Sequence, residues 1–162
     1  MKSYLSFLIL SFTLFSCSSV DSIKKSSNCI VWKDQKYMGP YSVDVIAKKI
    51  EWTGACIGYN RGCQEIVITL DENNNVLSGA ENLGKIENGE LKFSEKHSLS
   101  EVVNFTGIRA YPEQKLVKSS VVVENVSTEQ SFSFNNKCSA EEAVAGVVAL
   151  SLIEKAQSKD RK

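Results

Sequence analysis

The sequence predicts a mainly β fold, an antiparallel β-meander of repeated hairpins followed by one C-terminal α-helix. The first observation is a series of short β-rich runs, broken by turn residues, over residues 29–136, with no helix of three turns among them. The second is a segment poor in helix breakers at residues 137–158, ahead of a polar tail at 159–162. Residues 17–28 are rich in Ser and Lys, which predicts a flexible tether before the domain.

The strand pattern is clear at residues 64–70, where the β-branched Ile66, Val67 and Ile68 suit a pleated, half-buried surface. Turn-forming residues at 71–75 end this run and predict a hairpin. Three later runs show the same pattern, at 101–110, 115–124 and 129–134. Because nothing helical separates these runs, antiparallel neighbours are the economical topology.

The C-terminal segment opens with Ser139 and Glu142 at the spacing of a capping box, in which each side chain bonds the other's backbone N–H. Residues 140–156 then contain Gly146 as their sole helix breaker. Apolar positions recur on one helical face, together with one serine: Val144, Val147, Val148, Ser151 and Leu152. We expect this stripe to cover one side of the sheet.

The N-terminus has the pattern of an export signal at residues 1–16. Lys2 precedes an apolar run at 5–15 that is too short to span ~30 Å of hydrocarbon as a helix. The run ends in Leu14-Phe15-Ser16-Cys17, which resembles the lipobox of bacterial lipoprotein precursors. The alternative is an ordinary signal peptide with Cys17 as a spare thiol.

The lipobox resemblance implies a lipid anchor. Cys17 would carry diacylglycerol on its sulfur, become the N-terminus after cleavage, and be acylated on its amine. Two or more acyl chains give stable attachment to a membrane. Ser18, in place of an Asp, favours by the same resemblance the outer membrane, facing the periplasm, of a Gram-negative cell.

Charge and cysteine content limit the partners. The chain has 19 basic and 19 acidic side chains without a basic cluster, so we expect no nucleic-acid partner. Four cysteines remain after Cys17, namely Cys29, Cys56, Cys63 and Cys138. An even number in an exported chain indicates two disulfides, with three possible connectivities. A site of four metal-binding thiolates usually shows C-x2-C pairs, which are missing, so we expect no metal and no cofactor.

A weak repeat runs through the β region. Residues 52–54, 77–79 and 105–107 share a large apolar residue, any residue, and glycine. Such self-similarity is typical of stacked supersecondary units. We expect the large residue to pack between neighbouring hairpins, the adjacent glycine to leave room for it, and later glycines to form the turns.

The segments Cys29-Ile-Val-Trp32 and Trp52-Thr-Gly-Ala-Cys56, with glycines after them, resemble bacterial MORN-repeat proteins (membrane occupation and recognition nexus). Residues 77–89 resemble a second, divergent copy, in which Leu77 stands where the family prefers Tyr. The resemblance implies a membrane-associated scaffolding module. It also implies structural roles for Trp52, Gly54, Gly58, Gly62, Gly79, Gly84, Gly89 and Gly107.

The MORN resemblance favours one disulfide pairing. It implies a bond between Cys29 and Cys56, which leaves Cys63 to bond Cys138. A geometric rival exists, because a hairpin loop at residues 58–61 would place Cys56 opposite Cys63. Cys29 would then pair with Cys138.

No catalytic constellation stands out. His97, the sole histidine, lies in a polar stretch without a nucleophile or carboxylate motif, so we expect a solvated loop residue. Asp71 and the asparagines after it lack the calcium-loop pattern and indicate a turn. The chain is therefore expected to be a non-catalytic envelope lipoprotein, a scaffold or interaction module with an envelope protein as partner. Exposed aromatic residues would support this, with Tyr37, Tyr41, Tyr59 and Tyr111 as candidates.

The alternative function is a small-ligand-binding β-barrel lipoprotein. A closed barrel needs an apolar face on every strand, and residues 76–93 do not show one by strict alternation.

Overall fold

The computed structural model describes residues 28–33, 42–53, 65–94, 105–123 and 126–159. The strands in these parts are β1 (Cys29–Trp32), β2 (Ser42–Val45), β3 (Lys49–Thr53), β4 (Glu65–Leu70), β5 (Asn75–Ser78), β6 (Glu81–Glu87), β7 (Glu90–Phe93), β8 (Phe105–Tyr111), β9 (Leu116–Val123) and β10 (Val126–Phe134). A 3-10 turn, η1 (Pro112–Gln114), joins β8 to β9, and the helix α2 (Ala140–Lys159) follows β10. The prediction of a mainly β fold with a C-terminal helix is confirmed.

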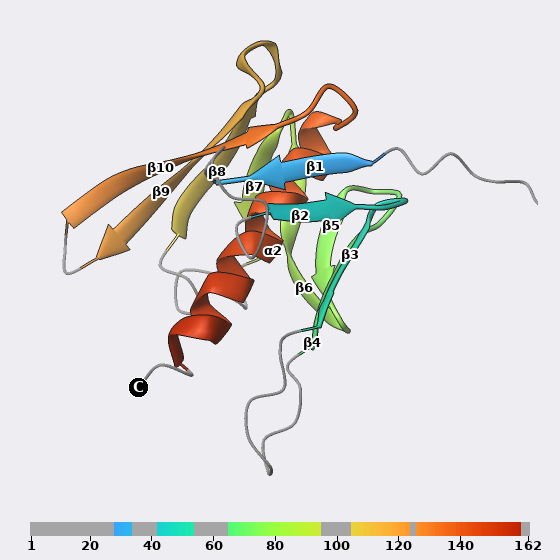
Figure 1. The fold of residues 1–162 in the computed structure, drawn as a ribbon, viewed down its shortest axis with the longest axis horizontal. Coiled ribbons are helices and arrows are strands. Elements are labelled where there is room, and N and C mark those ends of the chain that lie inside the picture. Colours follow the sequence, from blue (N-terminus) through green and yellow to red (C-terminus); the bar gives the residue numbers. More distant parts are fainter. Residues whose placement is uncertain (1–27, 34–41, 54–64, 95–104, 124–125, 160–162) are drawn as a thin grey trace, which may run out of the picture.

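All these strands form one antiparallel sheet with the order β2-β1-β10-β9-β8-β7-β6-β5-β4-β3. From β3 to β10 each strand pairs with the next one in sequence, which confirms the predicted meander. The β1–β2 hairpin joins the far side of β10, where Val31 lies opposite Phe134. The sheet curls until its two edge strands, β2 and β3, meet at a single turn (Figure 1).

The predicted capping box begins helix α2. The Ser139 N–H donates to Glu142 Oε2 at 2.9 Å, and the Glu142 N–H donates to Ser139 Oγ at 3.1 Å. These bonds satisfy two of the backbone donors that the first turn of a helix leaves unpaired. No helix in the described part of the chain has the combined length and apolar character needed to cross a membrane.

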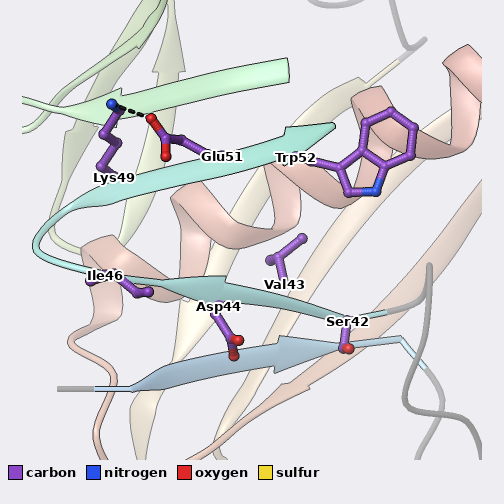
Figure 2. A pocket seen from close by; sticks show the side chains of 7 residues that line it. All are labelled: Ser42, Val43, Asp44, Ile46, Lys49, Glu51 and Trp52. Atoms are coloured by element: carbon purple, nitrogen blue, oxygen red, sulfur yellow. Dashed lines mark ion pairs between the residues drawn. The ribbon is translucent and has the colours of Figure 1, made fainter. Parts of the chain in front are cut away.

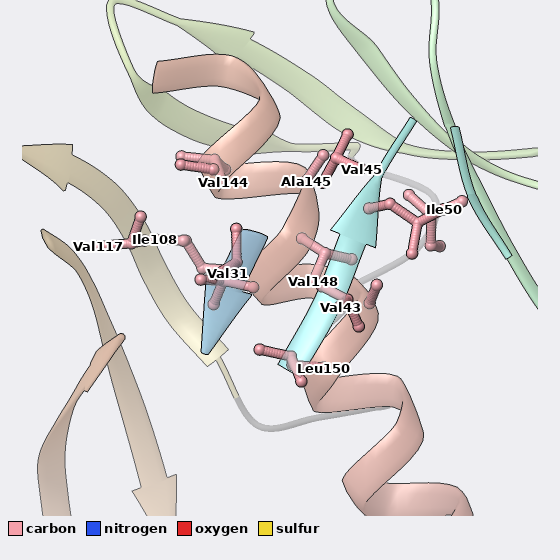
Figure 3. Close-up of a cluster of buried hydrophobic side chains, with 14 of the residues drawn as sticks. Val31, Val43, Val45, Ile50, Ile108, Val117, Val144, Ala145, Val148 and Leu150 are labelled. Atoms are coloured by element: carbon pink, nitrogen blue, oxygen red, sulfur yellow. The ribbon is translucent and has the colours of Figure 1, made fainter. Parts of the chain in front are cut away.

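Helix α2 lies inside the curve of the sheet, with side chains from β1, β2, β3, β8 and β9 around it (Figure 3). Its buried residues point in all directions around the axis: Ala143, Val144, Ala145, Val147, Val148, Ala149, Leu150, Ser151 and Ile153. The predicted stripe does pack against the inner face of the sheet, but the buried surface extends beyond it to the whole circumference of the helix. A helix that is apolar on every side is a buried helix, and α2 is the core around which the sheet wraps.

Gly146 lets the helix and the sheet come close together. A Cβ at this position would lie 2.6 Å from Val31 Cγ2 on β1, closer than real side chains pack. Lys33, just after β1, adds an ion pair with Glu154 of α2 at 2.9 Å. The N-terminal strand is thus held directly on the helix.

A β-bulge gives residues 76–93 the apolar face that strict alternation hides. Gly84 pairs with Val76 and Asn82 with Leu77, so Leu83 is an extra residue on β6. Leu83 and Ile86 are therefore both buried although they are three positions apart. The expectation that this stretch lacks an apolar face is wrong, because the bulge changes the alternation.

The disulfide joins Cys29 to Cys138, with the two Cα atoms 4.5 Å apart. The pairing of Cys29 with Cys56 that the MORN resemblance favours is therefore wrong. The reason is topological, because β1 lies beside β10 and so places Cys29 at the start of α2. Cys56 and Cys63 lie outside the described residues.

The turn between β4 and β5 is built by Asp71. Its Oδ1 accepts hydrogen bonds from the N–H groups of Asn73 and Asn75 at 2.8 Å each, and its Oδ2 accepts one from Asn75 Nδ2 at 2.7 Å. The pKa of Asp71 is lowered, chiefly by the side-chain bond from Asn75. The predicted turn is confirmed, and this carboxylate is used within it.

Candidate functional site

A surface cleft lies where the two edge strands of the sheet face each other (Figure 2). We call it the seam cleft. It has a volume of about 450 Å³ and opens between β2 and β3, which diverge from their shared turn. Its lining residues are Ser42, Val43, Asp44, Ile46, Lys49, Glu51 and Trp52.

The closed end of the seam cleft is a two-residue hairpin turn. Ile46 and Lys49 exchange both backbone hydrogen bonds, each 2.9 Å long. Ala47 and Lys48 between them have φ values of 49° and 62°, which is the pattern of a type I′ turn. The strands separate directly after this bridge, because the sheet contains no β2–β3 pairing beyond it among the described residues.

Backbone groups that have no partner strand among the described residues line both sides of the seam cleft. In an antiparallel hairpin alternate residues direct their N–H and C=O toward the partner strand. Val43 and Val45 lie opposite residues of β1, whereas Ile46 bonds across the turn. By this alternation the backbone of Asp44 points toward β3, and that of Glu51 points toward β2. These two residues would form the next bonded pair, and the cleft separates them.

The side chains divide the seam cleft into an apolar inside and a charged outside. Val43 is buried and Trp52 is partly buried against the core, at the wide end of the cleft in front of the helix (Figure 2). Asp44 and Glu51 are exposed on the other face of their strands. Glu51 forms an ion pair with Lys49 on its own strand. Among the described residues the Asp44 carboxylate has no ion-pair partner, so the rim carries a free negative charge.

The glycines of the proposed repeat have different local roles. Gly79 and Gly89 have φ values of 61° and 72° and form turns. At Gly84 a Cβ would collide with the carbonyl oxygen of Lys92 on β7, so this glycine is needed for strand contact. Nothing lies within 4 Å of a Cβ built at Gly79 or Gly107, so neither glycine leaves room for a packed side chain.

The large residues of the repeat also differ. Trp52 packs against the core, whereas on β5 the buried residue is Val76 and Leu77 is only partly buried. Several predicted positions lie outside the described residues: Cys17, Gly54, Cys56, Gly58, Gly62 and Cys63, together with His97.

Of the four candidate tyrosines, only Tyr111 lies in the described part of the chain. Arg109 and Lys118 each lie 5.8 Å from the centroid of its ring. Lys118 also forms an ion pair with Glu129 at 2.9 Å, and this hydrogen-bonded partner raises the lysine pKa. Tyr111 is thus part of a charged patch on the outer face of β8–β10.

The sequence analysis found Trp52 but missed the other residues of the seam cleft. Local patterns identify strands, whereas a cleft between the first and last strands of a sheet depends on how the whole sheet closes. The Ala47-Lys48 turn also lacks the Asn-Gly signal by which such hairpins are recognised.

No family model, curated protein or solved structure matches this chain. The MORN resemblance therefore stays a prediction. Function has to be inferred from the seam cleft and from the sequence motifs.

Proposed function

We propose that this chain is a bacterial envelope lipoprotein, anchored in a membrane by lipid on Cys17, that works without catalysis as an interaction module for another envelope protein. The observation that carries the proposal is the position of the seam cleft. It lies on the outside of the sheet, between two strand edges that have no further partner strand among the described residues, and beside a partly buried tryptophan. Unpaired strand edges and aromatic residues are features of protein-binding surfaces.

The alternative of a small-ligand carrier has less support. A barrel that carries a ligand holds it in its interior, lined by the inward side chains of the strands. Here those side chains pack against α2, in which Val144, Val148 and Leu150 are fully buried. The interior position that such a ligand would take is occupied by the helix.

The membrane location rests on the sequence motifs. The lipobox-like end of the signal supports lipidation at Cys17, and Ser18 favours an outer membrane facing the periplasm if the cell is Gram-negative. The MORN resemblance supports the same role, since it implies a membrane-associated scaffold. In this arrangement the tether at residues 17–28 would hold the domain close to other envelope proteins.

The test combines lipid labelling with cross-linking in intact cells. A bacterial host fed a palmitate analogue should label the wild type, and Cys17→Ala should lose both the label and the membrane fraction. Chemical cross-linking of cells expressing the wild type should give a discrete adduct with one envelope protein. The same adduct should weaken in Cys17→Ala. An unlabelled wild type that fractionates as a soluble protein and gives no adduct would overturn the proposal.

A further inference from the structure

We propose that the seam cleft binds an extended polypeptide segment, which adds as a strand to the free edge of β3 and carries a basic residue between two apolar ones. This inference rests on the proposed function and names the kind of partner that the module recognises. Three observations support it: the unpaired backbone edges, the division between apolar and charged side chains, and the confinement of both edges within the cleft.

The backbone groups of the cleft that lack a partner strand among the described residues can form main-chain hydrogen bonds with a polypeptide. The N–H and C=O of Glu51 on β3 point into the cleft, and those of Asp44 on β2 point back at them from the opposite side. Edge groups of this kind are the template for strand addition, in which main-chain hydrogen bonds supply affinity. The lining on β3 consists of Lys49, Glu51 and Trp52, which suits a short extended segment rather than a folded domain.

The side chains define the pattern of the segment. Successive side chains of a strand alternate between its two faces. Residues that point inward would lie beside Val43 and Trp52, so they should be apolar. The residue between them would point outward, beside the Asp44 carboxylate, whose charge is unpaired among the described residues. A lysine or arginine at this position would supply the missing positive charge.

The position of the edges favours a single strand over a second copy of this chain. Exposed edges usually risk sheet-to-sheet association between copies. The sheet has only two edges among its described strands, β2 and β3, and each faces the other across the cleft. The edge of a second folded copy is enclosed in the same way, whereas a single extended segment has both of its own edges free to pair.

The direct test uses a defined peptide with the chain from residue 17 onward, carrying Cys17→Ser and Trp32→Phe. Trp52 is then the sole tryptophan and reports occupancy of the cleft by fluorescence. The probe is the blocked pentapeptide Ser-Val-Lys-Val-Ser, compared with Ser-Val-Glu-Val-Ser and with versions N-methylated at single central residues. We expect saturable binding of the lysine peptide, about tenfold weaker binding of the glutamate peptide, and loss of binding on N-methylation of at least one residue.

A charge exchange identifies the contact. Asp44→Lys should weaken binding of the lysine peptide by about tenfold and make the glutamate peptide the preferred ligand. Glu113→Lys, on η1 outside the cleft, is the control and should change neither affinity. Hydrogen exchange should show new protection of the Glu51 amide when the lysine peptide binds. The exchange of the paired amides in β4–β10, measured in the same experiment without peptide, shows that the variants are folded.

Other outcomes overturn the inference. Binding that tolerates N-methylation at every central residue would indicate a side-chain ligand rather than an added strand. Self-association that the peptide displaces would indicate a second copy as the occupant. If no peptide binds but the cross-linked envelope adduct persists in Asp44→Lys, the cleft assignment fails while the proposed function stands.

Discussion

Two hairpins of this sheet share the same kind of turn, but the strands stay paired in one and separate in the other. The β2–β3 hairpin turns at Ala47-Lys48 and the β6–β7 hairpin at Asn88-Gly89, and all four residues have positive φ. The β6–β7 strands stay paired from Glu87 and Glu90 to Gly84 and Phe93. The β2–β3 strands have one bridge and then diverge. A type I′ turn can therefore start a ladder without determining how far it extends.

Turn composition is one difference between the two hairpins. Asn and Gly adopt left-handed conformations readily, whereas a left-handed Ala or Lys costs roughly 1–2 kcal/mol per residue. The β2–β3 turn is thus under strain, and the β6–β7 turn is relaxed. The strain at Ala47 and Lys48 is stabilised by the surrounding sheet, because Lys48 O also accepts a hydrogen bond from the Leu70 N–H of β4.

Like charges alone do not separate the two hairpins. Lys85 lies opposite Lys92, and Glu87 opposite Glu90, yet β6 and β7 remain paired. Each of these charges has an opposite charge on its own strand, in ion pairs of 3.0 Å. Across the cleft, Asp44 lies in register with Glu51 and lacks such a partner among the described residues. The two hairpins differ in that these charges on β6 and β7 are each neutralised by an ion pair on the same strand, whereas Asp44 on β2 has no such ion pair among the described residues.

Packing against the helix is a further difference, because α2 lies behind the point where β2 and β3 separate (Figure 2). Helix α2 contacts both β2 and β3, and the inward residues Val43, Val45 and Ile50 pack around it. The ten-stranded sheet curls around the helix until its two ends meet, and they meet at the Ala47-Lys48 turn. We therefore infer that the helix holds the two edge strands apart at the seam cleft.

Removing the disulfide should lower stability most, because the bond closes a long loop. It also tests the comparison, because Cys29 lies on β1, the strand that pairs with β2. The bond joins residues 109 positions apart, and the chain-entropy model gives ~4–5 kcal/mol for a loop of about this length. We expect the Cys29→Ala and Cys138→Ala double variant to lose stability of this order in urea unfolding. Hydrogen exchange should increase first in β1 and β2, because β2 pairs with β1 alone. A uniform increase that includes β6–β7 would mean that the two hairpins unfold together.

How much the sequence predicts can be judged from the same elements. The strands β4, β8, β9 and β10, the capping box of Ser139 and Glu142, and the Asp71 turn depend on residues close in sequence, and the sequence predicts all of them. The partner of Cys29 depends on which strand β1 joins, and that strand begins almost a hundred residues later at Val126. The enclosure of α2 had a sequence signal, since residues 143–153 contain no charged side chain. The seam cleft had none.

A glycine exchange should give the next effect and tests what keeps β6–β7 paired. Gly84→Ala places a methyl group against the Lys92 carbonyl at a φ of 154°, so we expect a loss of about 2–4 kcal/mol. Gly79→Ala is the matched control, with a φ of 61° and open space around it, and should cost about 1 kcal/mol. Urea unfolding measures both. Equal losses of stability in Gly84→Ala and Gly79→Ala would show that the positive φ alone requires glycine at Gly84, and that the contact with the Lys92 carbonyl does not.

An exchange of turns should give a smaller effect and separates turn strain from the helix as the cause of the open cleft. Ala47→Asn with Lys48→Gly gives β2–β3 the turn of β6–β7 and should stabilise the protein by about 1 kcal/mol. The Glu51 amide should nevertheless keep exchanging freely, because α2 still holds the strands apart. Protection of that amide in the variant would contradict this and make the turn the cause.

The smallest expected effect concerns the neutralised charges of β6–β7. The pKa of Glu90 is lowered, first by its hydrogen bond from Lys92 and then by the charges of Lys92 and Arg109. Because the folded pKa lies below the unfolded value of 4.5, ionised Glu90 stabilises the fold above that pH, and the contribution disappears as pH falls through the folded pKa. Acid should therefore weaken β6–β7 through this residue.

Lys92→Met tests this charge pairing directly. A carboxyl-carbon NMR titration should show the Glu90 pKa moving up toward its ordinary range in the variant, because its strongest partner is gone. Glu129→Gln serves as the control, since it removes the carboxylate that pairs with Lys118 and leaves Lys92 in place. The stability of Glu90→Gln should fall less between pH 7 and pH 3 than that of the wild type. An unchanged Glu90 pKa in Lys92→Met would show that its neutralisation comes from Arg109 on the neighbouring strand β8. The β6–β7 hairpin would then depend on β8 for its charge balance, whereas β2 has only β1 paired beside it and no described strand paired on the side of the cleft.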